Sequence, residues 1–167
     1  MISNRRAFIG LGGNEGDRPT ILRHAMRSLD RLSPGLRCSP VFESHPLGRQ
    51  RQPNFLNAVV EMWWKGSAYS LLTALQAIER RLGRRRMVRW SSRPVDLDLL
   101  LLDGHICCDG SLTIPHPSIA RRPFVLRPLL SLDSRVRSPV TGRRYARYLC
   151  LVPSRGMRRL DTSGWTS

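Results

Sequence analysis

The chain has 167 residues, of which 41% are hydrophobic and 24% are charged, as expected for a soluble globular protein with its own core. The formal net charge of +16, carried almost wholly by arginine, predicts affinity for polyanions. The sequence shows no apolar run long enough to span a bilayer and no signal peptide, so we expect a cytoplasmic protein without a membrane partner. The four cysteines lack zinc-site spacing and form a poor disulfide framework, which favours free thiols in a reducing compartment.

The first third of the chain predicts a strand, a helix and two further strands. Residues 6–11 have the pattern of a strand and lead into a glycine-rich turn, which is typical of backbone that approaches a ligand or another segment. This turn lacks the Gly-Lys-Ser/Thr of a P-loop. Asp17 is placed to cap a helix that ends near Leu32. The strands that follow are expected over 36–43 and 55–64, with a polar loop between them.

The rest of the chain predicts a second helix, a long strand and a shorter helical segment. Ser67 is placed to cap a helix that ends near Leu82. After an arginine-rich loop, residues 95–102 have the period of a strand, and we expect residues 105–108 to be its short hairpin partner. The final elements are a partly helical segment over 121–132, a small basic hairpin over 135–148 and a mobile tail from about residue 153.

This order of elements argues for a single domain of 167 residues in the α+β class. We expect one mixed, mainly antiparallel β-sheet with helices packed on both faces, a three-layer α-β-α arrangement of the ferredoxin-like kind.

The strand over 95–102 carries two carboxylates on one face. The period of two places Asp96 and Asp98 together with Leu100 and Leu102, and about 3.3 Å per residue puts the two aspartate Cα atoms about 7 Å apart. Such carboxylates repel each other and are tolerable when cations lie between them. Mg²⁺ takes one or two carboxylates plus substrate phosphates, which the upstream arginines would also bind. The alternative is a solvated basic loop followed by a strand with two exposed aspartates.

Four stretches in order resemble 6-hydroxymethyl-7,8-dihydropterin pyrophosphokinase, an enzyme family of folate biosynthesis. They correspond to the family's first strand and turn, its pterin loop and strand, its signature and its closing segment. The stretches are 8–14 (FIGLGGN), 46–59 (PLGRQRQPNFLNAV), 89–98 (RWSSRPVDLD) and 115–129 (PHPSIARRPFVLRPL).

The resemblance implies that the protein transfers pyrophosphate from ATP to the hydroxymethyl group of the pterin, giving the pterin diphosphate and AMP. It implies two Mg²⁺ ions as cofactors, held by Asp96 and Asp98, with ATP as co-substrate. The residues that match the family's catalytic positions are Arg84, Arg86, Arg93, Asp96 and Asp98. Those that match its ATP contacts are Gln76, Glu79, Arg84, Arg86, Arg89, Trp90, Arg93, His116 and Arg122.

A flat, aromatic, polar-edged pterin needs stacking faces and an amide. The residues that match the family's pterin contacts are Ser44, His45, Leu47, Phe55, Asn57, Trp90 and Phe124. Taken singly, several matches have plainer interpretations: Phe55 and Phe124 as core residues, His116 as a turn histidine between prolines, and Gln76 and Glu79 as surface positions on a helix.

The chain departs from the family pattern at a few positions. Ser91-Ser92 replaces the usual Gly-Pro of the signature, and Gly13 replaces a serine, which removes one hydroxyl. Phe55 stands where tyrosine is common, His45 where a small, acidic or proline residue is common, and Pro117 follows His116. None of these changes removes a metal carboxylate, so the resemblance implies retained activity, lowered or altered at most.

Two other functions are open to the sequence. A nucleic-acid-binding protein would explain the net charge of +16 and the loop arginines, although the basic residues are scattered and two carboxylates interrupt them. A degenerate relative could bind pterin or nucleotide without catalysis. We expect a monomer whose partners are ATP and the pterin, with at most non-specific nucleic-acid binding.

Overall fold

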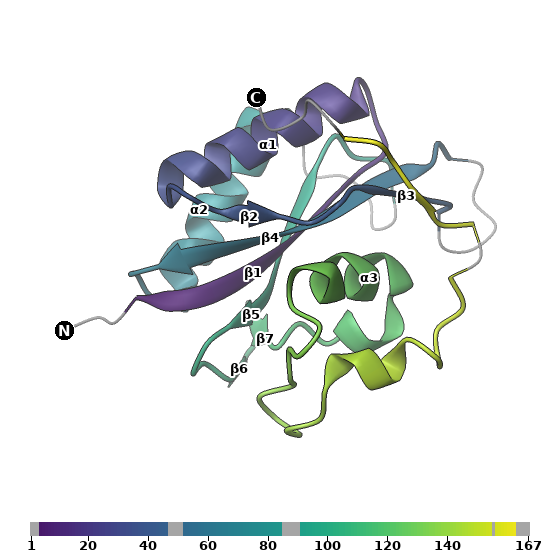
Figure 1. Cartoon of the computed structure of the whole chain (residues 1–167). Coiled ribbons are helices and arrows are strands. Elements are labelled where there is room, and N and C mark those ends of the chain that lie inside the picture. The colour runs from purple at the N-terminus through teal and green to yellow at the C-terminus, as the bar shows by residue number, and fades with distance from the viewer. Residues whose placement is uncertain (1–3, 47–51, 85–90, 155, 163–167) are drawn as a thin grey trace.

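The computed structural model describes residues 4–46, 52–84, 91–154 and 156–162. A six-stranded sheet forms the middle of the molecule, and its strands follow the order β5-β1-β4-β3-β8, with β2 also paired to β4 (Figure 1). The long strands are β1 (Arg5–Gly13), β4 (Phe55–Trp64) and β5 (Asp96–Leu102). The short ones are β2 (Arg37–Cys38), β3 (Phe42–Ser44) and β8 (Arg158–Arg159). All the pairings between these strands are antiparallel.

Helices cover both faces of this sheet. On one face α1 (Arg18–Leu32) and α2 (Ala68–Arg81) share a core with alternate residues of β1 and β4, such as Ile9 and Val60. On the other face α3 (Pro123–Leu132) packs its Leu126 against Phe8 and Val59. The expected α+β fold, a mainly antiparallel sheet between helical layers, is therefore confirmed. The assignment of the whole chain to a single domain stays a prediction.

The local signals for both long helices are found in the structure. The Asp17 carboxylate accepts a hydrogen bond from Thr20 N at 3.2 Å and so caps α1. The Ser67 hydroxyl accepts one from Ser70 N at 3.0 Å and caps α2. Pro123 begins α3, and Pro128 lies inside that helix. Among the helices that the described residues form, none has the length and apolar character that crossing a membrane requires.

The strand expected over 36–43 is instead two short strands, β2 and β3. Pro40 has no N–H to contribute to a ladder. Ser39 uses both its backbone N–H and its hydroxyl to bond to Val59 of β4. Ser39 N donates to Val59 O at 2.9 Å, and the Ser39 hydroxyl accepts from Val59 N at 2.9 Å. The break separates β2 from β3, and β3 borders the pocket described below.

The regular alternation predicted along residues 95–102 is wrong beyond Leu99. Phe8 of β1 faces Leu101 while Ile9 faces Leu99, so Leu100 is an extra residue and forms a β-bulge. Leu100 and Leu101 both pack under α3, and Leu102 returns to the opposite core. The bulge lies after Asp98, so the expected common face of the two aspartates is unaffected.

The hairpin partner predicted for β5 is also wrong. Residues of the predicted segment form β6 (Cys107–Cys108), which pairs with β7 (Thr113–Ile114) in a separate two-stranded sheet. The edge of β5 is reached instead by the chain that follows β7, because His116 N donates to Leu100 O at 2.8 Å. This connection brings His116 to the side of β5 that carries Asp98.

The C-terminal region contains two short elements. A bridge between Arg137 and Arg144 forms the expected small hairpin, which leads into the 3₁₀ helix η2 (Tyr145–Tyr148). Beyond it, β8 pairs with β3, and Leu160 N donates to Val41 O at 2.9 Å. Mobility of the tail from about residue 153 stays a prediction, but part of that tail belongs to the main sheet.

We predict that Leu126→Ala will lower the free energy of unfolding by about 2–5 kcal/mol, because this side chain is fully buried and its loss leaves a cavity between α3 and the sheet. Leu126→Met keeps the volume and should cost less than about 1.5 kcal/mol. Urea denaturation followed by circular dichroism measures both. Equal costs for the two variants would mean that α3 is not packed as described.

Candidate active site

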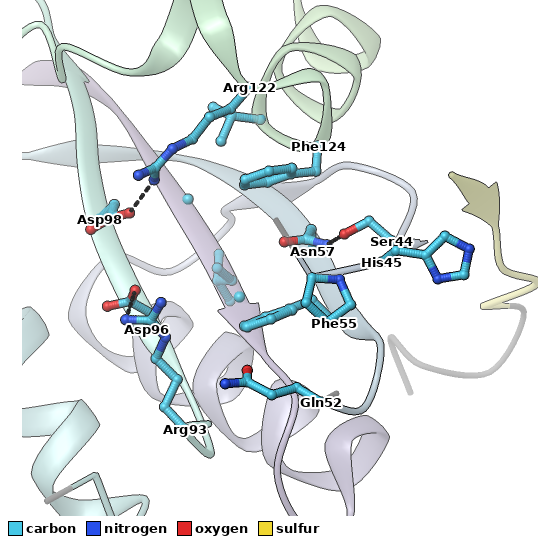
Figure 2. Close-up of a pocket in the computed structure, with 15 residues that line it drawn as sticks. Ser44, His45, Gln52, Phe55, Asn57, Arg93, Asp96, Asp98, Arg122 and Phe124 are labelled. Carbon is cyan, nitrogen blue, oxygen red and sulfur yellow. Dashed lines mark hydrogen bonds and ion pairs between the residues drawn. The ribbon is translucent and has the colours of Figure 1, made fainter. Parts of the chain in front are cut away.

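One pocket opens where β1, β4 and β5 meet β3 and the start of α3 (Figure 2). We call two parts of it the aromatic end and the charged end. The aromatic end consists of Ser44, His45, Phe55, Asn57 and Phe124, and the charged end consists of Arg93, Asp96, Asp98 and Arg122. The remaining lining residues are Gly10, Leu11, Gly12, Pro46, Gln52 and Val125. Residues from both halves of the chain therefore meet in one concave site.

The middle of the pocket is open because β1 contributes glycines there. Gly10 pairs with Asp98 and Gly12 with Asp96 across the β1–β5 ladder. On its other side Gly12 pairs with Asn57, whose side-chain oxygen lies within 3.5 Å of where a Gly12 Cβ would stand. Two residues without side chains thus separate the carboxylates from the amide and leave room for a ligand.

Asp96 is balanced by two arginines. Arg84 Nη1 lies 2.6 Å from one of its carboxylate oxygens, and Arg93 Nη1 lies 3.0 Å from the other. Arg84 also contacts Glu79, whose buried carboxylate accepts a hydrogen bond from Leu97 N at 2.7 Å. Glu79 of α2 therefore connects the helix, the arginine and β5. Burial raises the pKa of Glu79 to about 7, although the Leu97 and Arg84 bonds favour its charged form.

Asp98 has looser partners and faces the pocket more openly. His116 Nε2 and Arg122 Nη1 each lie 4.0 Å from one of its oxygens. Burial and the neighbouring Asp96 charge raise the pKa of Asp98, while burial lowers the pKa of His116. A carboxylate whose charge is disfavoured in this way gains most from a cation supplied with a ligand.

A second cavity adjoins the charged end on the far side of Asp98. Asp98 lines both cavities, and His116 lies beside Asp98 in the second one. Apolar side chains of α2, β5 and the β6–β7 hairpin contribute to its lining. Its lining residues are Leu72, Leu97, Asp98, Leu99, Asp109, Gly110, Ser111, Leu112, Thr113, His116 and Pro117. The charged end therefore lies between the aromatic end of the first pocket and the second, partly apolar cavity.

The aromatic end presents two rings and an oriented amide. Figure 2 shows Asn57 between the rings of Phe55 and Phe124. The Asn57 amide nitrogen donates to the Ser44 hydroxyl at 2.9 Å and to Phe42 O at 3.4 Å, so β3 fixes the orientation of the side chain. The guanidinium of Arg93 lies 6.0 Å from the Phe55 ring centre, and that of Arg122 lies 5.9 Å from the Phe124 ring centre. A flat aromatic ligand with polar edges would fit this end.

Asn14 joins the segments around the pocket, a role that the sequence interpretation missed. It is almost fully buried, its backbone N donates to Arg93 O at 3.0 Å, and its side-chain oxygen accepts from Arg93 N at 3.0 Å. Its amide nitrogen donates to the side-chain oxygen of Gln52 at 3.1 Å and to Pro53 O at 3.3 Å. The sequence motifs place Asn14 only in the first strand and turn and Gln52 only in the loop before the strand over 55–64.

The glycine at position 13 has a structural reason in this chain. A Cβ at Gly13 would overlap the carbonyl oxygen of Pro94, so a serine there would require the Pro94 backbone to move. The departure from the family's serine therefore accompanies a close approach between β1 and the residues that precede Asp96.

Many of the predicted site residues come together. The two cavities are lined by Ser44, His45, Phe55, Asn57, Arg93, Asp96, Asp98, His116, Arg122 and Phe124. Arg84 and Glu79 reach the site through Asp96, and Glu79 is buried rather than a surface position. Gln76 is exposed on α2 and lines neither cavity. The predictions for Leu47, Arg86, Arg89 and Trp90 lie outside the described residues.

Comparisons with known proteins point to one family. The family model described as 7,8-dihydro-6-hydroxymethylpterin-pyrophosphokinase (HPPK) matches residues 8–134. The chain is 39% identical over 141 residues to the 2-amino-4-hydroxy-6-hydroxymethyldihydropteridine pyrophosphokinase of Bacillus subtilis (strain 168), covering 83% of this chain and 84% of that protein. It is 35% identical over 158 residues to the folic acid synthesis protein fol1 of Schizosaccharomyces pombe, covering 93% of this chain but spanning only 21% of that protein.

A solved structure has the same fold. The crystal structure of wild-type Plasmodium falciparum HPPK-DHPS aligns with a TM-score of 0.70 at 12% identity, covering 89% of this chain and 45% of that one. At this low identity the match concerns the fold alone.

We predict that Asn14→Ala will destabilise the protein by about 1–3 kcal/mol, because it leaves the Arg93 N–H without its acceptor and removes the bonds to the 52–53 segment. Asn14→Asp keeps an acceptor for Arg93 but loses the amide donor. Its cost should be smaller if the Arg93 bond dominates. Urea denaturation of the three proteins tests this, and an unchanged midpoint for Asn14→Ala would contradict it.

The raised pKa of Glu79 predicts a pH-dependent stability. Since the folded-state pKa of about 7 lies above the ordinary 4.5, the folded protein binds more protons than the unfolded chain between these values. The stabilising contribution of Glu79 is therefore complete below 4.5 and is lost as the pH rises through about 7. Relative to Glu79→Gln, the wild type should lose about 1–3 kcal/mol of unfolding free energy between about pH 5 and about pH 8.

The control for this titration is Glu15→Gln, which removes an exposed carboxylate of the turn after β1. Denaturant unfolding at several pH values should give parallel curves for this variant and the wild type. A constant difference between the wild type and Glu79→Gln across the range would refute the assignment.

Proposed function

Because the chain belongs to the 7,8-dihydro-6-hydroxymethylpterin-pyrophosphokinase family, we propose that it transfers a pyrophosphoryl group from ATP to the hydroxymethyl group of 6-hydroxymethyl-7,8-dihydropterin. The products are AMP and the pterin diphosphate, an intermediate of tetrahydrofolate biosynthesis. One observation carries the proposal: a single pocket has two aromatic rings and an amide at one end and two carboxylates with arginines at the other.

The pterin binds at the aromatic end. Phe55 and Phe124 supply faces on which the flat ring stacks, and Asn57 forms hydrogen bonds with the polar edge of the ring. Because the Asn57 amide nitrogen donates to β3, its oxygen is the group that accepts from the pterin N–H groups. Ser44 and His45 border the same end, and Leu47 and Trp90 are assigned to it through the family pattern.

The phosphates of ATP bind at the charged end. Arg93 and Arg122 each lie beside one of the aromatic rings, so the same arginines can meet phosphates that extend toward the pterin hydroxymethyl group. His116 borders the second cavity, whose apolar residues suit the flat base of the nucleotide. The family pattern adds Arg84, Arg86, Arg89 and Trp90 from the arginine-rich loop and Gln76 and Glu79 from α2.

The chemistry of the donors fits Mg²⁺. Asp96 and Asp98 are hard oxygen ligands on one face of β5, and burial and the Asp96 charge raise the pKa of Asp98, so a cation would stabilise its charged form. Among the described residues no group of three or more His, Cys, Asp or Glu side chains is placed to hold a metal ion, so the remaining ligands would have to be phosphate and water. Two bound Mg²⁺ ions would neutralise the phosphates and polarise the transferred group.

The protein's own contribution is positioning and charge stabilisation. Stacking at the aromatic end fixes the pterin so that its hydroxymethyl group faces the charged end, which turns an encounter between two substrates into a local reaction. Arg93 and Arg122 offset the negative charge of the transferred group and of the departing AMP. Arg84 also orients Asp96 by contacting its carboxylate, and Glu79 supports that arginine.

We further propose that the enzyme acts as a monomer in the cytoplasm and that its net charge of +16 gives only non-specific attraction for nucleic acids. A dedicated nucleic-acid-binding site is disfavoured by the two carboxylates at the centre of the pocket, which would repel a phosphate backbone. Catalysis, rather than binding alone, is favoured by the presence of both the carboxylate pair and the arginines.

The deciding experiment incubates the purified chain with ATP, Mg²⁺ and 6-hydroxymethyl-7,8-dihydropterin and follows AMP by chromatography. AMP should form only when the pterin is present, and EDTA should abolish it. ADP in place of AMP, or AMP formation independent of the pterin, would overturn the proposed reaction. Pterin binding without any turnover would identify the degenerate alternative.

We predict that Asp98→Asn will lower turnover at least about 10²-fold, equivalent to about 2.7 kcal/mol of barrier, because it removes a metal carboxylate while keeping the size of the side chain. Asp103→Asn is the matched control, since this exposed aspartate directly follows β5. Both variants should unfold at denaturant concentrations close to that of the wild type. Comparable turnover in the two variants would exclude Asp98 as a metal ligand.

A further inference from the structure

Ser154 and residues 156–162 lie along the outer side of the aromatic end. Ser154 contacts α3, because Arg127 Nε donates to its hydroxyl at 2.8 Å. Residues 158–159 form β8, which adds a strand to the free edge of β3. Figure 1 shows this segment in yellow passing from the region of α3 to β3. It therefore connects two elements that line the pocket, and it lies beyond residues 8–134, which the family model matches.

Gly156 lies directly against His45. Its φ of +76° is a conformation that side chains disfavour, and an added Cβ would overlap the imidazole ring. The ring is held from the other side, because His45 Nδ1 pairs with the Asn54 side-chain oxygen at 2.8 Å. Figure 2 shows the yellow C-terminal strand beside His45 at the edge of the pocket. His45 therefore lines the pocket and contacts both Asn54, which precedes β4, and the C-terminal segment.

Arg158 fixes β3 through a carboxylate. Arg158 Nη2 donates to one oxygen of Glu43 at 3.0 Å, and Arg18 Nη1 lies 3.2 Å from the other. Arg18 also donates to Asn54 O at 2.6 Å. These arginine bonds lower the pKa of Glu43, so the contact persists in its charged form at neutral pH. The C-terminal strand, β3 and the start of β4 are thus joined around one carboxylate.

The position of β3 affects the orientation of the Asn57 amide. This strand has only three residues, and two of them, Phe42 and Ser44, receive the hydrogen bonds of the Asn57 amide nitrogen. Without β8, β3 would be an edge strand paired on one side only, with unpaired backbone groups and a freer position. A small shift of β3 would move the acceptors that orient Asn57.

We propose that residues 156–160, anchored at Ser154, act as a strap that positions the aromatic end, and that Gly156 and Arg158 are positioning residues for the pterin. This inference rests on the proposed function, because it takes the pterin as the ligand of the aromatic end. The strap touches neither the charged end nor the reacting atoms, so it sets the affinity for the pterin and leaves that for ATP unchanged.

The first test is Gly156→Ala, which introduces both backbone strain and an overlap with His45. Gly142→Ala is the matched control, because Gly142 has a similar φ of +67° but open space where its Cβ would lie. By calorimetry Gly156→Ala should weaken pterin binding about tenfold. Its ATP affinity, and both affinities of Gly142→Ala, should stay within about twofold of the wild type. Equal pterin affinity in the two variants would overturn the proposal.

The second test uses neighbouring arginines of β8 and decides the matter if Gly156→Ala fails to fold. Arg158→Gln removes the bond to Glu43, whereas Arg159→Gln removes the same charge from the neighbouring position of the same strand; both arginines are exposed. Arg158→Gln should raise the KM for the pterin about fivefold with little change in kcat or in the KM for ATP, and Arg158→Lys should restore part of it. Equal effects of Arg158→Gln and Arg159→Gln, or a fall in kcat alone, would overturn it.

The wild type distinguishes failure of this inference from failure of the proposed function. If the wild type binds the pterin and the variants of Gly156 and Arg158 bind it equally well, only the strap is refuted. If the wild type does not bind the pterin at all, the proposed function fails and the strap fails with it.

Discussion

The arrangement of this protein depends on the balance of two carboxylates on one strand. Asp96 and Asp98 face the same pocket, so their like charges repel each other and nearby positive charge stabilises the pair. Asp96 receives this charge from Arg84 and Arg93, whose nitrogens lie within 3.0 Å. Asp98 has looser cationic neighbours, His116 and Arg122, which lie 4.0 Å away, and burial together with the Asp96 charge raises its pKa. In the proposed function, ATP with its Mg²⁺ ions would complete this balance, which would account for residues of both signs at the charged end.

The backbone of β1 and the hydrogen bonds of buried side chains hold the other parts of the site around this pair. The glycines of β1 keep the space between the carboxylates and Asn57 open, while Asn14 connects β1 to the segments on both sides of the pocket. Glu79 extends the same support from α2 to Arg84 and β5. Phosphoryl transfer requires mainly correct placement of two substrates and stabilisation of charge, so a site built from a rigid sheet with charged residues at its rim suits this chemistry.

Sequence patterns predicted the larger features well and the shorter ones less well. The capped helices, the strand over 55–64, the α+β class and the family are confirmed, because each rests on many residues or on several motifs in order. The split of the strand at Pro40 and the bulge at Leu100 were not predicted. The split follows from Pro40 and from the bonds of Ser39 to Val59, and the bulge is a register shift against β1, neither of which a period of two can reveal. The assignments of individual site residues stay predictions that the experiments above address.

The sequence by itself determined the family, the fold class and the identity of the chemical groups, because residue types at fixed spacings carry that information. The tertiary structure alone decided how these groups are balanced: that Glu79 is buried against Arg84, that Asn14 links separate segments, and that Gly156 lies on His45. Asn14 and Arg93 are 79 positions apart, and His45 and Gly156 are farther apart still. No local pattern encodes such a pairing, since it depends on which surfaces meet when the sheet and helices pack.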